Sequence, residues 1–409
     1  MDLSSWTMAA RPRTLSLSMT PVAVGAAMVW AADRKVHWLA VTRGTARHYI
    51  YSTRDSPRRK RCEAGSPQMN ALKLSLWWRA FTNFYRPDTR DITSLDGVTL
   101  FLYAARSVIL VISAQAAIIA GLLAIDAGLF TWINFIGVLA GFVVAHMISN
   151  LSNDYFGFLR GHDTPDSPRM SYTMHPFASG TIDRHTLVTG FVLLATVGVA
   201  ITTCFIIERG WMAVAFAVTG ISLLFLYDAG PAPLKSVGLG EFAVLLVWGP
   251  LMIGGGFAMI TGQLSANAMF ASLPYGLGVM TILVGKHIDQ VDFDSRRNIR
   301  TLPVLLGERA ARALNIAAVF AIYAIVAILI GFERLTPFAA AIVLAAPRAV
   351  YAIKLMSRPH PAAPPGGYIG WPLWYHRACL EHNRVLGWAY IGGLATDAVW
   401  RGATSLAPG

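Results

Sequence analysis

Long apolar stretches of about twenty residues recur along most of this 409-residue chain, and they limit its possible folds more than any other feature. Only 14% of the residues are charged, and these gather between the apolar stretches, whereas soluble domains carry about a quarter of their residues charged. A bilayer-spanning helix satisfies its own backbone hydrogen bonds. The stretches are too long for the alternating strands of a membrane barrel. The sequence therefore predicts an all-α polytopic membrane protein.

Nine apolar segments follow one another from residue 98, and we assign residues 98–409 to one transmembrane domain. The segments are 98–125, 128–152, 186–207, 211–227, 238–260, 268–288, 310–331, 336–355 and 385–400. Loops after the even-numbered segments are rich in Arg and Lys, and by the positive-inside rule these face the cytoplasm. The loops also account for much of the net charge of +12. We therefore expect contact with membrane lipid and no nucleic-acid partner.

The first 97 residues follow a different pattern. Residues 1–32 form an extra apolar N-terminal segment with basic residues on both flanks, so a full crossing and a re-entrant or peripheral placement both remain open. Residues 33–97 are basic and predict a flexible cytoplasmic insertion, in which the stretch RDSPRRKRC (54–62) would contact anionic lipid. Three widely spaced cysteines indicate neither a disulfide framework nor a metal site.

Two polar clusters directly follow apolar segments, both on the predicted cytoplasmic side. One is NDYFGFLRGHD (153–163), and the other is KHIDQVDFDSRRNIRTLP (286–303). Asn150 and Asp154 are four residues apart, so on a helix they share one face. The same holds for Asp289 and Asp292, which are three residues apart. At two places in the chain, an apolar segment is therefore followed directly by a group of carboxylates.

Carboxylates at the end of a membrane helix are costly unless a cation neutralises them. These clusters offer hard oxygen donors without paired His or Cys, which favours Mg²⁺ completed by phosphate oxygens and water. We therefore predict that the two clusters face each other across a cavity and hold a diphosphate through Mg²⁺. Nearby Arg and Lys would bind the remaining phosphate charge. The alternative interpretation is that these are solvated loop charges.

The clusters also resemble the paired Asp-rich motifs of the UbiA superfamily of intramembrane prenyltransferases. NLSNDYFGFLRGHDT (150–164) is similar to the first motif of the menaquinone branch, the 1,4-dihydroxy-2-naphthoate polyprenyltransferases, and DQVDFDSRRNIRTLPVLLG (289–307) to the second. The resemblance implies about nine transmembrane helices in a bundle around a central cavity. It further implies Mg²⁺-dependent transfer of a polyprenyl group from its diphosphate to a quinone-type aromatic acceptor, in a membrane such as the bacterial inner membrane.

This resemblance suggests roles for the residues of both motifs. The metal ligands would be Asn153, Asp154 and Asp163 for a first Mg²⁺, and Asp289, Asp292 and Asp294 for a second. Substrate would be bound by Asn150, Asn153, Arg160, Lys286, Arg300 and Tyr155. The catalytic residues would be Asp154, Asp289 and Lys286. Tyr172 would help to shield an allylic cation, and His175 and His287 are candidate proton acceptors beside their alternative as loop histidines.

Two positions depart from the family pattern. Gly157 stands where the family has a metal-site Asp, and Gln290 stands where an Asp is common. Asp154 would replace the first of these with altered geometry; otherwise the first metal binds weakly. Two alternatives to an active transferase therefore remain: a catalytically impaired family member, and a transporter or channel whose charges would lie near the middle of the membrane.

Overall fold

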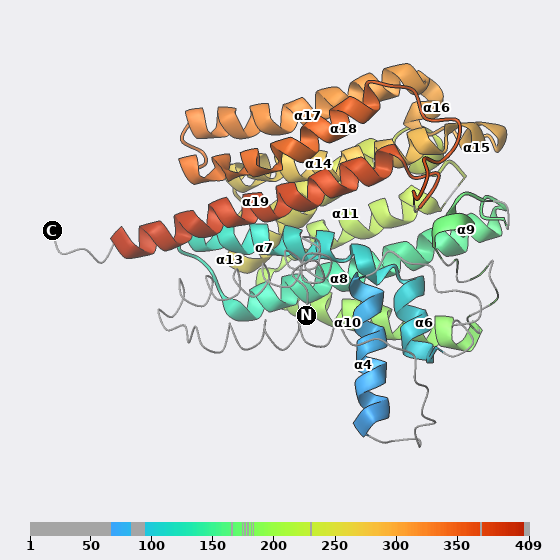
Figure 1. The fold of residues 1–409 in the computed structure, drawn as a ribbon. Coiled ribbons are helices and arrows are strands. Elements are labelled where there is room, and N and C mark those ends of the chain that lie inside the picture. Colours follow the sequence, from blue (N-terminus) through green and yellow to red (C-terminus); the bar gives the residue numbers. More distant parts are fainter. Residues whose placement is uncertain are drawn as a thin grey trace, which may run out of the picture.

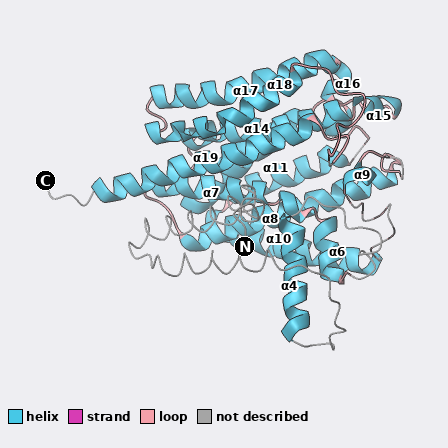
Figure 2. Cartoon of the chain, in the orientation of Figure 1, coloured by secondary structure: helices cyan, strands magenta, loops and turns pink. Residues whose placement is uncertain are grey.

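The computed structural model describes residues 67–82 and 95–404, apart from positions 165, 166, 174, 176, 178, 179, 181, 183, 230 and 369. The apolar segment 1–32 lies outside the described residues. Every regular element in the described part of the chain is a helix (Figure 2). The prediction of an all-α protein is therefore confirmed.

Eight helical segments of the described chain are long and apolar enough to cross a membrane. They are η1 (Ser107–Ile109) with α7 (Val111–Asp126), α8 (Trp132–Leu159), α10 (Arg184–Arg209), α11 (Trp211–Asp228), α12 (Gly240–Leu246) with η3 (Val247–Gly254) and α13 (Gly255–Thr261), α14 (Ala266–Asp289), α17 (Glu308–Gly331), and η4 (Pro337–Ala345) with α18 (Ala346–Met356). A further long helix, α19 (Tyr375–Thr404), packs against α14 and η4 (Figure 1). The predicted count of nine crossings stays a prediction.

The first predicted segment, 98–125, is not one helix, and that prediction is wrong. The chain forms α6 (Gly97–Ala104), whose N-terminus is capped by the Asp96 carboxylate, and then turns at Arg106 before η1 and α7 begin. Arg106 has a φ of 55°, in the left-handed region that costs a non-glycine residue about 1–2 kcal/mol. This break places an arginine inside the helix bundle.

Part of the predicted flexible insertion 33–97 is a helix. Helix α4 (Pro67–Thr82) lies across the long helices (Figure 1) and packs against α6 and η1. Ala80 is buried there, and the Trp77 indole donates a 3.2 Å hydrogen bond to Asp96. The expectation of flexibility therefore does not extend to residues 67–82.

Glycines on α14 let its neighbours approach closely. A Cβ on Gly276 would lie 2.9 Å from the Cα of Gly249 in η3, and a Cβ on Gly278 would meet the Asn383 side chain of α19. Small residues at helix interfaces commonly allow such close approach in membrane bundles. Gly285 does the same directly before the second polar cluster, because its Cβ would lie 2.9 Å from the His376 backbone nitrogen. The start of α19 is thus held beside the end of α14.

The two polar motifs meet at one end of the bundle. The end of α8 and the short helices α9 (Arg169–Tyr172), α15 (Val291–Arg296) and α16 (Leu302–Leu306) gather there (right side of Figure 1). Arg297 of the second motif donates hydrogen bonds to the Gly161 carbonyl at 2.8 Å and to the Thr164 hydroxyl at 2.7 Å, both in the first motif. The predicted proximity of the motifs is therefore observed, while their cytoplasmic orientation stays a prediction.

Candidate active site

A cavity of about 500 Å³ lies between α8, α10, α11, η3 and α14. Most of its lining is apolar, with the rings of Phe142, Phe216 and Trp248 among its walls. The ionisable and amide side chains that line it are few: Arg106, His146, Asn150, Asn153, Tyr227, Lys286 and His376. The cavity therefore has a long apolar part and a limited set of polar groups, as expected of a site for an amphiphilic ligand.

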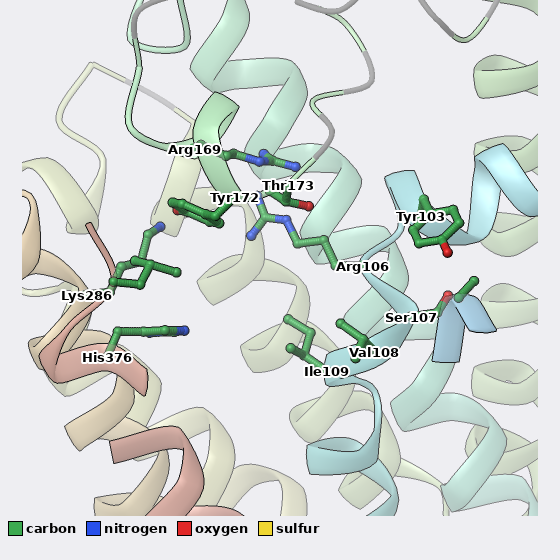
Figure 3. Close-up of a pocket in the computed structure, with 12 residues that line it drawn as sticks. Tyr103, Arg106, Ser107, Val108, Ile109, Arg169, Tyr172, Thr173, Lys286 and His376 are labelled. Carbon is green, nitrogen blue, oxygen red and sulfur yellow. The ribbon is translucent and has the colours of Figure 1, made fainter. Parts of the chain in front are cut away.

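A smaller cavity of about 100 Å³ adjoins the first. Arg106, Lys286 and His376 line both cavities, and Arg169 and Tyr172 line the small one. Figure 3 shows Lys286 and His376 on one side of this space and Arg106 on the other, with Arg169 and Tyr172 beside them. The place where the two cavities meet is thus lined by cationic side chains, where the sequence predicted carboxylates.

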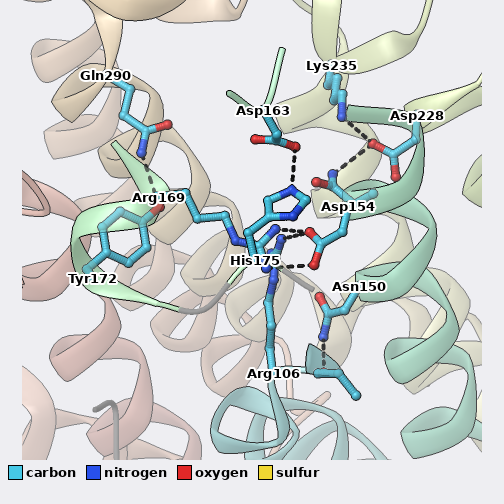
Figure 4. A network of polar contacts seen from close by, with 12 residues as sticks. Arg106, Asn150, Asp154, Asp163, Arg169, Tyr172, His175, Asp228, Lys235 and Gln290 are labelled. Atoms are coloured by element: carbon cyan, nitrogen blue, oxygen red, sulfur yellow. Dashed lines mark hydrogen bonds and ion pairs between the residues drawn. The ribbon is translucent and has the colours of Figure 1, made fainter. Parts of the chain in front are cut away.

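Asp154 is fully buried and is held by two arginines (Figure 4). Arg106 forms an ion pair with its Oδ1, and Arg169 binds both oxygens, with 2.6 Å between Arg169 Nη2 and Asp154 Oδ2. Such forked contacts between guanidinium and carboxylate are strong and directional. Asp154, predicted as a metal ligand and catalytic residue, therefore orients two arginines in this structure.

Lys286 lies on the last turns of α14 and is half-buried. Among the described residues no carboxylate contacts it; the buried Asp294 attracts it from a longer distance. Lys286 lines both cavities. An ammonium group in a largely apolar setting is costly unless an anion is bound beside it. The predicted phosphate contact for Lys286 is consistent with this placement.

The space left by Gly157 is filled by the carboxylate of Asp163. The chain turns after α8 at Gly161, which has a φ of 67°, and the Asp163 N–H then donates to the Gly157 carbonyl at 3.2 Å. A Cβ built on Gly157 would lie 3.1 Å from the Asp163 Cγ and closer still to its Oδ2. Asp163, and not Asp154 as predicted, therefore places a carboxylate where the missing family residue would project.

His175 supports the Asp163 carboxylate. Its Nε2 lies 3.2 Å from Asp163 Oδ2, and the imidazole is fully buried. Burial alone would raise the pKa of Asp163, but the contact with His175 and the nearby cationic side chains hold this pKa below its usual value. Asp163 is therefore ionised at neutral pH, and His175 has a positioning role.

The second motif does not present its carboxylates to the cavity. Asp289 accepts backbone N–H bonds from Tyr375 and His376, both at 2.9 Å, and its side chain is fully buried. It therefore caps the N-terminus of α19, whereas its roles as a metal ligand and catalytic residue stay predictions. Asp292 is exposed, and Asp294 is buried, which raises its pKa. Neither lines either cavity.

The other predicted substrate contacts divide into two groups. Asn150 and Asn153 line the large cavity, and their NH₂ groups donate to the Ala105 carbonyl at 3.0 Å and to Asp228 at 2.8 Å. Asp228 also pairs with Lys235 at 2.7 Å. Arg160, Tyr155 and Arg300 lie elsewhere: Arg160 donates to the Asp228 carbonyl, Tyr155 is 45% exposed and packs on Phe177, and Arg300 is exposed.

Sequence reasoning missed Arg106, Arg169 and His376. Arg106 interrupts the apolar run AARSVILVIS, and a charge inside such a run is a signal of function. Arg169 resembled a loop charge that sets orientation. His376 lay before the predicted start of the last apolar segment, and the extension of α19 back to Tyr375 brings it to the cavity.

The predicted pair of Mg²⁺ sites does not fit these residues. Within the described part of the chain, no group of three or more His, Cys, Asp or Glu is placed to hold a metal ion. Asp289 caps a helix and Asp154 is bound by two arginines. Gly157 and Gln290 supply no carboxylate, and Gln290 instead donates to the Tyr172 hydroxyl at 3.2 Å. We therefore derive no step through a metal ion.

A family model described as the UbiA prenyltransferase family matches residues 114–371. The chain belongs to the UbiA prenyltransferase family. This confirms the predicted family. The 1,4-dihydroxy-2-naphthoate octaprenyltransferase of Bacillus subtilis is 26% identical over 225 residues, which cover 54% of this chain and 70% of that protein. The similarity to a protein of this name supports the predicted menaquinone branch.

Another relative aligns with this chain over a smaller share of its own length than the Bacillus subtilis protein does. The UbiA prenyltransferase domain-containing protein 1 homolog of Drosophila melanogaster is 29% identical over 189 residues, which cover 45% of this chain and half of that protein. A solved UbiA homolog from Archaeoglobus fulgidus aligns with a TM-score of 0.50 at 12% identity, over 76% of this chain and 100% of that chain. At this identity the likeness concerns the fold alone. It agrees with the predicted helical membrane architecture.

Proposed function

We propose that this protein transfers a prenyl group from a prenyl diphosphate to a quinone-type aromatic acceptor within the membrane. The observation that carries the proposal is a 500 Å³ apolar cavity among membrane-spanning helices that adjoins a group of cationic side chains. An isoprenoid tail suits the apolar walls, and its diphosphate suits Arg106 and Lys286. Membership in the UbiA prenyltransferase family supports the same reaction class.

The reaction requires the bond between the first prenyl carbon and the diphosphate oxygen to break. The electron pair leaves with the diphosphate, and the allylic cation is attacked by an electron-rich ring carbon, which forms the new carbon–carbon bond and then loses a proton. Cationic side chains stabilise the negative charge that develops on the leaving diphosphate. The aromatic side chains of Phe142, Phe216 and Trp248 line the cavity, and an aromatic ring face turned to the allylic cation would stabilise it.

His376 is the candidate acceptor for the ring proton. Its Nδ1 lies 3.2 Å from the Ile282 carbonyl, and because a carbonyl oxygen only accepts hydrogen bonds, Nδ1 carries the hydrogen. Its Nε2 is then left with a lone pair, and the imidazole lines both cavities. His376 replaces the predicted candidates His175 and His287, which contact Asp163 and Glu241.

The name of one relative supports the proposed acceptor class. The Bacillus subtilis relative is named for 1,4-dihydroxy-2-naphthoate, and we propose an acceptor of this kind, with its ring in the small cavity beside Tyr172 and His376. The tail would occupy the large cavity. A location in the bacterial inner membrane, with the motif end facing the cytoplasm, belongs to the same proposal.

The test is product formation by the full chain in lipid nanodiscs. Labelled prenyl diphosphates of several chain lengths are incubated with 1,4-dihydroxy-2-naphthoate or other dihydroxylated aromatic acids, and products are identified by mass spectrometry. We expect one prenylated aromatic product, formed far more slowly by His376→Gln. A folded protein that prenylates no acceptor, but moves an anion across vesicles unchanged, would refute the proposal and favour a transporter.

A further inference from the structure

The junction of the two cavities carries more positive than negative charge. Arg106, Arg169 and Lys286, here called the basic cluster, contribute three cationic groups. Asp154 is the carboxylate that contacts two of them. Three other nearby carboxylates lie against different groups: Asp163 against His175, Asp228 against Lys235 and Asp289 against backbone N–H groups. Asp294 is buried and attracts both Lys286 and His287 without contacting Lys286. Asp154 and the more distant Asp294 therefore face three cations, which still leaves an excess of positive charge beside an apolar cavity.

The side chains of the basic cluster are aimed at one space. Arg106 and Lys286 come from opposite sides of it, and Arg169 lies above them in the view of Figure 3. The Nε of Arg106 is buried and has no hydrogen-bond partner among the described residues. The backbone of Arg106 is held in the left-handed region, a strained placement of the kind that persists at functional sites.

Two acidic residues that the family resemblance leads us to expect are absent from the region of the basic cluster. Gly157 and Gln290 stand at positions where an acid is expected, and Lys286 lies one helical turn before Gln290. An acidic site must recruit a metal ion to bind a diphosphate, whereas arginine and lysine bind phosphate oxygens directly. The absence of these two acids beside three basic side chains thus favours a different way of binding the same group.

We propose that the basic cluster binds the diphosphate of the prenyl substrate directly, without a bridging Mg²⁺. This inference rests on the proposed function, because it takes a prenyl diphosphate as the ligand. Arg106 and Arg169, oriented by Asp154, present to the phosphate oxygens the N–H groups that Asp154 does not bind, and Lys286 supplies a compact charge from the opposite side. The Lys286 ammonium then gains in the complex the contacting counter-charge that the described residues do not give it.

The experiment measures binding of geranyl diphosphate and inorganic pyrophosphate to the full chain in nanodiscs by calorimetry, with excess EDTA or with Mg²⁺. We expect binding of geranyl diphosphate in EDTA that weakens as salt rises. Lys286→Gln and Arg106→Gln should each weaken it by about tenfold or more, because a hydrogen bond to a charged group is lost. The matched control is Lys354→Gln, which removes the same charge from an exposed position on α18 and should leave binding unchanged.

Lys286→Met separates binding from folding. Removing an ammonium that no carboxylate contacts should raise resistance to unfolding while binding of the diphosphate is still lost. Binding that is absent in EDTA and restored by Mg²⁺ would overturn the proposal, as would unchanged affinity in Lys286→Gln. The two proposals fail separately. Binding in EDTA without transfer to any acceptor would support metal-free diphosphate binding by the basic cluster and refute the proposed function. Binding and turnover that both require Mg²⁺ would support the proposed function and refute metal-free binding.

Discussion

Replacing Gly157 by alanine tests whether Asp163 occupies the space of the missing family carboxylate. The added Cβ would lie 3.1 Å from the Asp163 Cγ and closer to its Oδ2, so this carboxylate has to move. Its contact with His175 Nε2, at 3.2 Å, is then lost. Asp163 sits in a turn directly after α8, so little backbone freedom is available to restore the contact.

The size of the effect follows from two opposing terms. Loss of a buried contact that involves a charged group costs about 1.5–3 kcal/mol. Glycine to alanine within a helix gains up to about 1 kcal/mol, so the net loss in free energy of unfolding should be about 1 kcal/mol. Gly392→Ala is the matched control, because Gly392 lies within α19 and a Cβ there has nothing within 4 Å. The control should gain up to about 1 kcal/mol.

Equilibrium unfolding in mixed micelles of a mild detergent and dodecyl sulfate compares the two variants with the parent chain. A double variant, Gly157→Asp with Asp163→Ala, returns a carboxylate to the same space and should be more stable than the sum of its single changes predicts. If Gly157→Ala is stabilised as much as Gly392→Ala, then Asp163 does not hold the position that the structure gives it, and the reasoning is refuted.

Three further predictions concern residues whose roles the structure reassigns. Asp289→Ala should lower the free energy of unfolding by about 0.5–2 kcal/mol through loss of the α19 cap, as measured in the same micelles; unchanged stability would contradict the capping role. Asp154→Ala should cost about 3–5 kcal/mol, because two buried guanidinium groups lose their counter-charge, and a variant that unfolds like the parent would exclude this ion pair. His376→Gln should reduce kcat by about 10²–10⁴ with diphosphate affinity unchanged; a loss of affinity without a change in kcat would show that His376 binds substrate and moves no proton.

Much of the architecture could be predicted from the sequence because membrane helices obey a length rule. Hydrophobic length placed most spans within a few residues, since every backbone group in lipid has to be satisfied inside its own segment. The rule failed at Arg106, where the helix is interrupted within an apolar run. A hydropathy average over the run does not reveal this interruption. The length rule also placed the end of α8 too early. The apolar run stops at the polar motif, whereas the helix continues to Leu159.

The site could be located from the sequence, but the roles of its residues could not. Spacing correctly brought the two motifs to one end of the bundle, as the contacts of Arg297 show. It did not reveal that Asp289 faces the backbone of α19, since that partner lies 86 residues away in the chain. The pairing of Asp154 with Arg106 likewise depends on a contact across 48 residues. Side-chain partners at such separations are set by helix packing and leave no local pattern.

The most direct measurement is an experimental structure of the full chain in nanodiscs with an unreactive thio analogue of a prenyl diphosphate. The account predicts the isoprenoid tail inside the 500 Å³ cavity and phosphate oxygens within hydrogen-bond distance of Arg106 and Lys286. Phosphate oxygens bound instead near the exposed Asp292, with the tail outside the cavity, would contradict it.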